Sequence, residues 1–137
     1  MLALYIGNHL LKTLCKGEIM IKNNRQKGSH YEEVAALYLQ QQGYRILEKN
    51  YRCKLGEIDL IGLDNNVVVF IEVKYREKTT YGHPFFAVTK KKQRTIYQVA
   101  NYYLSEKKLS YYGSYRFDVV GILGDKIQLL KNAFGGM

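Results

Sequence analysis

The sequence predicts an α/β domain in which helices flank a mixed five-stranded sheet, in the order α-β-β-β-α-β-β. Residues 29–42 and 89–108 carry apolar residues at helical spacing, and five shorter stretches are rich in β-branched and aromatic residues. The chain has 137 residues, 47% hydrophobic and 24% charged, which is typical of one globular domain with a sizeable core. We expect that domain over residues 28–134, after an N-terminal extension over residues 1–27 and before a tail over residues 135–137.

The first helix is expected over residues 29–42. Its apolar residues follow the i, i+3, i+4, i+7, i+8 pattern of one amphipathic face: Tyr31, Val34, Ala35, Tyr38 and Leu39. Ser29 suits the N-cap and Gly43 the C-cap. At about 100° per residue, Glu32 lies at the margin of the buried face, whereas Glu33 points towards solvent.

Three strands are expected after this helix. YRILEKNYR covers residues 44–52, GEIDLIGL residues 56–63 and VVVFIEVKYR residues 67–76. The third is apolar enough to lie centrally in a sheet. Asn65 and Asn66 favour a tight hairpin between the second and third strands, because Asn tolerates the positive φ that a type I′ turn requires.

The second half of the chain contains a helix and two strands. A loop over residues 76–88, with the only proline, leads into a helix over residues 89–108. The core stripe of that helix consists of Ile96, Val99, Ala100, Tyr103 and Leu104. RFDVVGIL at residues 116–123 and KIQLLK at residues 126–131 predict the last two strands, joined by a Gly-Asp turn.

The predicted hairpin brings acidic residues together. A turn at Asn65-Asn66 sets Asp59 opposite Glu72 and Glu57 opposite Lys74, all on one face. Directly paired positions have Cβ atoms only about 4.5–5.5 Å apart. Two carboxylates at that distance repel, so either one of them is protonated or a cation lies between them.

These acids predict a site for a hard divalent cation, Mg²⁺ or Mn²⁺, with Asp59 and Glu72 as ligands. Such an ion neutralises charge that develops on a phosphate and lowers the pKa of a coordinated water. Lys74, two residues after Glu72 on the same face, could orient that water or stabilise the transition state. Two structural explanations stay open: a slipped register, and a Glu57–Lys74 salt bridge beside a solvated edge.

The chain is strongly basic, with 21 Lys and Arg against 12 Asp and Glu and a net charge of +9. This excess fits a polyanionic partner, most often nucleic acid, although basic proteins without a specific partner also occur. KKKQR opens the second helix even though cations are unfavourable at the positive end of a helix dipole. We expect a DNA-binding surface of Lys90, Lys91, Lys92 and Arg94, with Gln93 in an auxiliary role. An ordinary solvated basic face is the alternative.

The cysteines and apolar runs bear on the cellular compartment. Cys15 and Cys53 form neither a disulfide framework nor a zinc-ligand spacing, which favours reduced thiols in a cytoplasmic protein. No apolar run approaches the roughly 20 residues of a membrane span, and the N-terminus lacks the basic region of a signal peptide. A second methionine, Met20, suggests that residues 1–19 are a start-site extension or a flexible arm.

The motifs also carry a family resemblance. Asp59, twelve residues and then Glu72-Val73-Lys74 resemble the Asp…(Asp/Glu)-x-Lys signature of the PD-(D/E)XK nuclease superfamily. The wider sequence resembles the YraN family of small bacterial proteins, which is similar to archaeal Holliday-junction resolvases. The residues concerned are AALYLQQQGYRILEKNYRCKLGEIDLI, VVVFIEVKYR, YGHPFFAVTKKKQRTI, RFDVVGI and KNAF. This resemblance covers about residues 28–134 and implies a restriction-endonuclease-like fold.

The resemblance assigns roles to individual residues. It implies that Asp59 and Glu72 bind metal and that Lys74 assists catalysis. An acid that the family carries in the first helix, three residues before an alanine, matches Glu32. A first-turn acid favoured by the helix dipole is the alternative explanation of Glu32. Glu57 matches the family's GEID run, and we expect it to pair with or orient Lys74 rather than bind metal.

The function implied by the resemblance is that of a metal-dependent endonuclease, a hydrolase of DNA phosphodiesters. Selectivity for DNA structure and a link to DNA repair or recombination would follow. A two-fold homodimer with paired sites would suit branched DNA. Two alternatives stay open: a non-catalytic nucleic-acid-binding module with a nuclease fold, and an interaction or scaffold protein.

Overall fold

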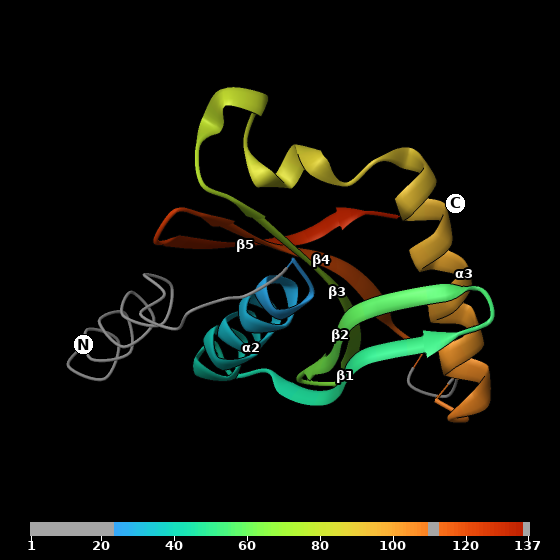
Figure 1. The fold of residues 1–137 in the computed structure, drawn as a ribbon. Helices are drawn as coiled ribbons and strands as arrows, with labels where there is room; N and C mark the ends of the chain where they lie inside the picture. The colour runs from blue at the N-terminus through green and yellow to red at the C-terminus, as the bar shows by residue number, and fades with distance from the viewer. Residues whose placement is uncertain (1–23, 110–112, 136–137) are drawn as a thin grey trace.

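The computed structural model describes residues 24–109 and 113–135, and within them the predicted fold class and element order are confirmed (Figure 1). The helices are α2 (Asn24–Gln41) and α3 (Lys90–Glu106). The strands are β1 (Arg45–Cys53), β2 (Gly56–Asp64), β3 (Val67–Arg76), β4 (Tyr115–Leu123) and β5 (Lys126–Phe134). Two short 3₁₀ helices, η1 (Thr79–Tyr81) and η2 (Pro84–Ala87), occupy the loop between β3 and α3.

Some expectations concern residues outside these ranges. Cys15 and Met20 belong to residues 1–23, which lie outside the described part of the chain, as do residues 136–137 of the tail. Cys53 is described and is a free thiol. Within residues 24–109 and 113–135, neither helix combines the length and the apolar character needed to cross a lipid bilayer.

The sheet has the order β1-β2-β3-β4-β5, so β3 is central, as its apolar sequence predicts. β3 pairs with β2 antiparallel and with β4 parallel, and the other two ladders are antiparallel. Neighbouring residues of β3 alternate between two cores: Val69 and Ile71 pack with α2, whereas Val68 and Phe70 pack with α3. The two helices therefore cover opposite faces of the sheet. All five residues of the predicted α3 stripe are buried.

The first helix begins earlier than the sequence predicts. α2 starts at Asn24, so Ser29 lies inside the helix and is not its N-cap. The residues before Gly28 are mostly good helix formers, and once a helix has nucleated each further residue adds a hydrogen bond at little cost. The expected domain boundary at residue 28 falls within this helix.

β5 also runs further than expected, to Phe134 instead of residue 131. The ring of Phe134 stacks on Phe117 of β4, with 5.1 Å between centroids. Burial of this pair against the α3-side core favours the longer strand.

The β2–β3 hairpin turns at Asn65-Asn66, and the predicted register holds as far as Leu60 opposite Ile71. A slipped register is therefore excluded. Asn65 has a positive φ of 54°, but Asn66 does not. The turn is therefore not the predicted type I′, which requires positive φ at both central residues. Positive φ is costly for a residue with a Cβ, and here only one position bears that cost.

β2 and β3 separate beyond the Leu60–Ile71 pair. From there β2 remains paired with β1 alone, and β3 remains paired with β4 as far as Arg76. Figure 1 shows β2 turning away from the upper part of β3. We call the space between these diverging halves the fork. The Val73 N–H faces the fork and donates to Asp59 Oδ2 at 2.8 Å.

Candidate functional site

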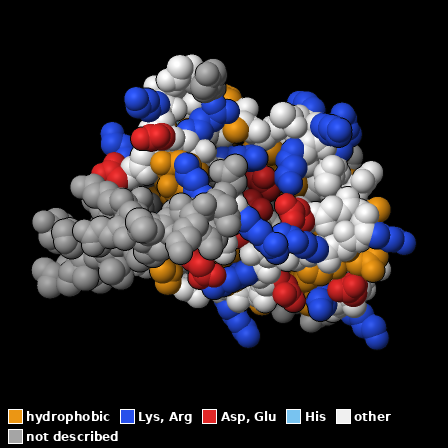
Figure 2. All heavy atoms as spheres, viewed as in Figure 1, with side chains coloured by type: hydrophobic (Ala, Val, Ile, Leu, Met, Phe, Trp, Pro, Cys, Tyr) orange, Lys and Arg blue, Asp and Glu red, His pale blue; other side chains and the backbone are white. Residues whose placement is uncertain are grey.

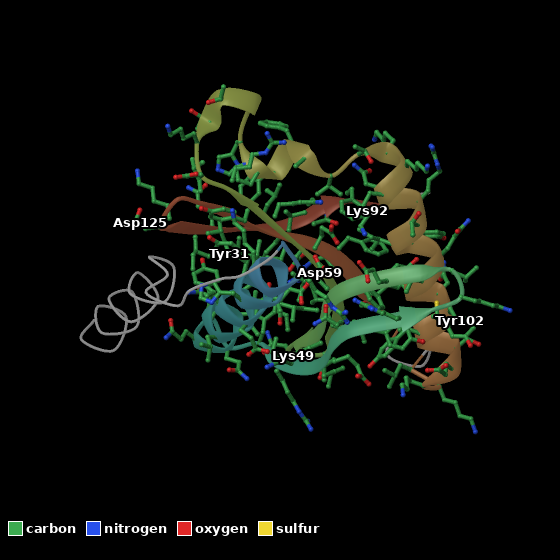
Figure 3. The ribbon with its side chains drawn as sticks, in the orientation of Figure 1. Tyr31, Lys49, Asp59, Lys92, Tyr102 and Asp125 are labelled. Carbon is green, nitrogen blue, oxygen red and sulfur yellow. The ribbon has the colours of Figure 1, made fainter. Side chains whose placement is uncertain are left out.

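A cavity of about 270 Å³ opens in the fork. Its charged lining consists of Glu32, Glu57, Asp59, Glu72, Lys74 and Lys92. Glu32 comes from α2 and Lys92 from α3, although these helices lie on opposite faces of the sheet. Both reach the cavity because the sheet is open at the fork. Figure 2 shows acidic side chains gathered near the centre of this face with Lys and Arg side chains around them, and Figure 3 labels Asp59 in the same region.

Glu72 is the most buried acid of the cavity, with 3% of its surface exposed. Its Oε1 lies 3.3 Å from Lys74 Nζ and 3.9 Å from Lys92 Nζ, whereas its Oε2 is buried without a hydrogen-bond partner. Burial, and next the negative charge of Asp59, raise the pKa of Glu72 to about 8. A buried oxygen without a partner is costly, and a cation in the cavity would give it one.

Asp59 lies on the other branch of the fork. Burial raises the pKa of its carboxyl group above the ordinary value, and the hydrogen bond from Val73 N–H opposes part of that rise. The negative charge of Asp59 raises the pKa of Glu72, which agrees with the repulsion expected for carboxylates placed together.

Glu32 also faces the cavity. Burial, and then the negative charge of Asp59, raise its pKa to about 7. Glu32 lies about two turns after Asn24, so the first-turn explanation of this acid is wrong. Its neighbour Glu33 is exposed and pairs with Lys49 at 3.0 Å, as expected for a solvent-facing residue.

Glu57 does not pair with Lys74, and this expectation is wrong. Glu57 lies opposite Arg52 of β1, and its Oε2 is 3.1 Å from Arg52 Nε. Lys74 instead contacts Glu72. The strands separate before they reach Glu57 and Lys74, so the expected salt bridge between these two residues cannot form across the ladder. Glu57 remains at the cavity wall and contributes to the raised pKa of Glu32.

The basic residues of α3 divide into two groups. Lys90, Lys91 and Arg94 are exposed, whereas Lys92 is half-buried and lines the cavity. A sequence signal for this division existed: Lys92 precedes the buried Ile96, Val99 and Tyr103 by four, seven and eleven residues, which places all four on one helical face.

Gln93 does not line the cavity. Its Nε2 donates to the Val88 carbonyl at 3.1 Å, which ties the start of α3 to the preceding loop. The auxiliary role of Gln93 in DNA binding stays a prediction, and its Oε1 is buried without a hydrogen-bond partner in the described part of the chain.

A second charged cluster lies on the α2 side of the sheet and was not anticipated. Asp118 is fully buried and accepts hydrogen bonds from Tyr44 Oη (2.9 Å), Arg116 Nε (2.8 Å) and Asn132 N (2.9 Å). Arg116 also bonds Asp64 at 2.8 Å. Hydrogen bonding to Asp118 raises the pKa of Arg116 further, which keeps it charged. Both oxygens of Asp118 have donors, so this cluster is structural.

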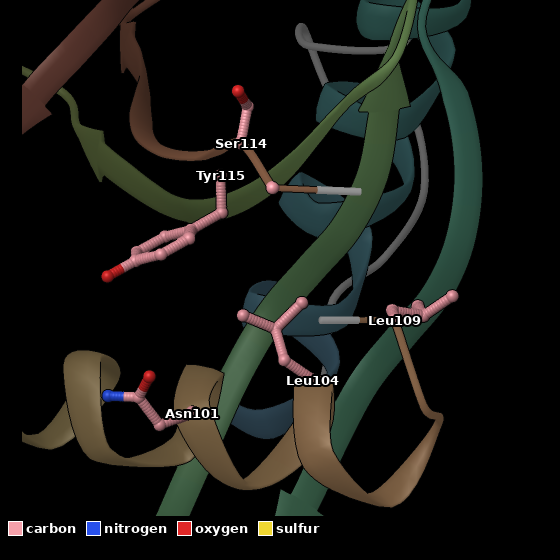
Figure 4. Close-up of a pocket in the computed structure, with 6 residues that line it drawn as sticks. Asn101, Leu104, Leu109, Ser114 and Tyr115 are labelled. Atoms are coloured by element: carbon pink, nitrogen blue, oxygen red, sulfur yellow. The ribbon is translucent and has the colours of Figure 1, made fainter. Parts of the chain in front are cut away.

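Another cavity, of about 220 Å³, lies towards the C-terminal end of α3 (Figure 4). Asn101, Leu104, Leu109, Ser114 and Tyr115 line it, together with Gly113. None of these residues carries a charge or a metal-binding carboxylate at neutral pH. It is therefore a weaker candidate than the cavity in the fork.

The residues of the fork fit Mg²⁺ or Mn²⁺. The donors are carboxylate oxygens, which hard cations prefer. Within the described ranges, no group of three or more His, Cys, Asp or Glu side chains is arranged to hold a metal ion by itself. Asp59 and Glu72 would thus be two side-chain ligands, and oxygens of water and phosphate would complete the shell, as is usual for Mg²⁺.

The acids of the cavity predict that the metal-free protein loses thermal stability as the pH rises from about 5 to about 8. The folded chain holds protons on Glu32 and Glu72 that the unfolded chain releases above their ordinary pKa of 4.5. Their stabilisation is complete below that pH and is lost as the pH passes through about 7 and about 8. In EDTA, Glu72→Gln should flatten the melting temperature against pH, whereas Glu33→Gln should not. Equal profiles for Glu72→Gln and the parent would contradict this.

Comparison with known proteins adds a family match. The model of Uncharacterised protein family UPF0102, the YraN family, matches residues 31–122, a segment that contains all six charged residues of the cavity. A UPF0102 protein of Lachnoclostridium phytofermentans is 48% identical over 112 residues, which cover 82% of this chain and 95% of the relative. UPF0102 proteins of Syntrophus aciditrophicus and Clostridium botulinum (strain Loch Maree) are 46% and 44% identical over 115 and 117 residues. These matches cover 81% of this chain in both cases, and 90% and 95% of the relatives. The resemblance to the YraN family is confirmed.

Proposed function

The chain belongs to the UPF0102 family, and we propose that it is a metal-dependent nuclease that hydrolyses DNA phosphodiesters. The observation that supports this best is Glu72: a buried carboxylate beside Asp59, with two ammonium groups on one oxygen and no partner on the other. Such a site can hold a cation and place positive charge next to a phosphate. We further propose selectivity for DNA structure and a cytoplasmic role in repair or recombination, in line with the resolvase resemblance.

Four charged residues of the cavity have a catalytic or metal-binding role in this proposal. Asp59 and Glu72 would hold the cation, which when bound would neutralise charge on the phosphate and acidify a water. In hydrolysis the water oxygen attacks phosphorus, the bond from phosphorus to the leaving oxygen breaks, and that oxygen takes a proton. Lys74 would stabilise the charge that develops on the phosphate oxygens. Glu32, with a pKa of about 7, is suited to exchange a proton with the water.

Cleavage assays test the proposal directly. Purified parent and Asp59→Asn would be incubated with linear duplex, single-stranded and four-way-junction DNA in Mg²⁺, Mn²⁺ or EDTA. The parent should cut at least one substrate with Mg²⁺ or Mn²⁺ and none in EDTA, and Asp59→Asn should be inactive. Equal cutting by both proteins would indicate a contaminant. Binding without cleavage of any DNA or RNA would favour a non-catalytic binding module.

Lys92→Ala should tighten metal binding while it slows cleavage. Lys92 Nζ lies 3.9 Å from Glu72 Oε1, so its positive charge opposes a cation at the same carboxylate. We expect metal affinity measured by calorimetry without DNA to rise roughly two- to tenfold. Single-turnover cleavage should fall by about tenfold or more, because a charge next to the phosphate is lost. Lys91→Ala should leave metal affinity unchanged. Weaker metal binding by Lys92→Ala would contradict a cation site at the carboxylate of Glu72.

The exposed cations of α3 should contribute to DNA affinity through phosphate contacts. Replacing Lys90, Lys91 and Arg94 with Gln should weaken binding to all sequences alike. Each lost contact should reduce the slope of log affinity against log salt by about 0.9. Fluorescence anisotropy at several salt concentrations measures this, with Lys126→Gln as an exposed control on β5. An unchanged slope would mean an ordinary solvated face.

A further inference from the structure

Phe86 is the most exposed large hydrophobic side chain of the described residues. It is 85% exposed, whereas the next are Tyr115 at 42% and Leu37 and Leu55 at 41% each. A single exposed apolar side chain is common and has no meaning by itself. Whether Phe86 has a role depends on how the segment that carries it is held in place and on which residues lie near it.

The segment that carries Phe86 is fixed to the sheet. In η2, Phe85 N–H donates to His83 Nδ1 at 3.2 Å, so Nε2 of the same ring carries the proton and donates to Gln128 Oε1 at 2.9 Å. The ring of Phe85 packs against Gly121 of β4 so closely that a Cβ there would lie 2.8 Å from the ring. Phe85 thus anchors η2 while Phe86, the next residue, is left in solvent.

The segment that carries Phe86 links the strand next to the cavity with the basic start of α3. Gly121, which contacts Phe85, is paired with Lys74 in the β3–β4 ladder. Lys90 follows Phe86 by four residues, so their Cα atoms are at most about 14 Å apart. Figure 1 shows the yellow η2 segment leading directly into α3. The exposed ring therefore lies within about 14 Å of Lys90, Cα to Cα, and is carried by a segment that packs on the strand paired with Lys74.

We propose that Phe86 stacks on an unpaired base of the DNA whose phosphates bind Lys90 and Lys91. This rests on the proposed function in one respect, that DNA is the ligand. A phenyl ring stacks on any base, but the base must not already be stacked within a duplex. Because η2 is anchored before binding, little additional ordering is needed. The contact would give the protein a preference for single-stranded or branched DNA.

The absence of tryptophan from the sequence provides a direct probe. Phe86→Trp introduces one tryptophan, and a Lys74→Ala background prevents cleavage during the measurement. Binding of single-stranded oligothymidine should quench the fluorescence at position 86. Leu37→Trp, on the exposed side of α2 across the sheet, is the matched control and should not be quenched. In anisotropy, Phe86→Ala should bind single-stranded DNA about tenfold more weakly and duplex DNA within about twofold of the parent.

The outcomes separate this proposal from the nuclease proposal. If labelled DNA binds but position 86 is not quenched and Phe86→Ala binds like the parent, stacking is wrong and nuclease function stands. If no oligonucleotide binds, both proposals are wrong. If Phe86→Ala instead abolishes self-association in sedimentation, Phe86 contacts a second copy of the chain and the stacking role is overturned.

Discussion

Lys74→Ala should slow DNA cleavage by about 10²–10³-fold while metal binding stays intact or becomes tighter. The ammonium group lies 3.3 Å from Glu72 Oε1 at the cavity wall, so its removal leaves both proposed metal ligands in place. It also removes a positive charge that opposes a cation at Glu72. The side chain is 31% exposed and lies outside both hydrophobic cores, so the fold should be unaffected.

Single-turnover cleavage and calorimetric metal titration measure these two effects separately. DNA affinity should change little, because Lys74 is one of 21 basic residues. Lys78→Ala, exposed in the loop after β3, is the control and should cleave at the parent rate. Cleavage by Lys74→Ala at the parent rate would mean that the activity arises elsewhere or from a contaminant.

Asp118→Ala should lower the free energy of unfolding by about 3–5 kcal/mol, the largest stability effect expected for one carboxylate in this chain. The substitution leaves Arg116 charged and largely buried, with 19% of its side chain exposed, and removes the acceptor of Tyr44 Oη and Asn132 N. Arg116 keeps its ion pair with Asp64, so the cost comes mainly from the loss of the buried partner of its charge and from the unsatisfied donors.

Urea unfolding measures this effect, with Asp125→Ala at the β4–β5 turn as a control that should change stability by less than about 0.5 kcal/mol. Asp118 alternates with Phe117 and Val119, which face α3, so its side chain lies on the α2 side of the sheet. The side chain of Glu72 does not lie on that side. Asp118→Asn should therefore keep the metal affinity of the parent. A loss below about 1 kcal/mol in Asp118→Ala would contradict a structural role for the cluster.

Local patterns were sufficient to predict much of the fold. The α3 stripe depends on helical periodicity alone, and β3 has the predicted bounds because a continuous apolar run requires burial on both faces. The hairpin register followed from the position of the Asn65-Asn66 turn. The same reasoning predicted that Asp59 and Glu72 lie together. Both line the cavity, at the point where the pairing of β2 with β3 ends.

The features that could not be predicted depend on where the strands separate and on contacts distant in sequence. Glu57 pairs with Arg52 because β2 stays paired with β1 beyond the point where β2 and β3 separate. The sequence of the β2–β3 hairpin does not indicate where this separation occurs. Tyr44 and Asp118 are 74 residues apart, and their contact forms only when four strands are assembled. The predicted cap at Ser29 failed for another reason: capping ability alone does not stop a helix whose preceding residues are also helix formers.

The central claim is that Asp59 and Glu72 bind a divalent cation in the fork. Anomalous diffraction from crystals soaked in Mn²⁺ tests this most directly, because the signal locates the ion without any assay of activity. We predict one strong peak within bonding distance of an Asp59 carboxylate oxygen and of Glu72 Oε2, and its loss in Asp59→Asn. No peak at saturating Mn²⁺, or a peak only outside the fork, would contradict the claim.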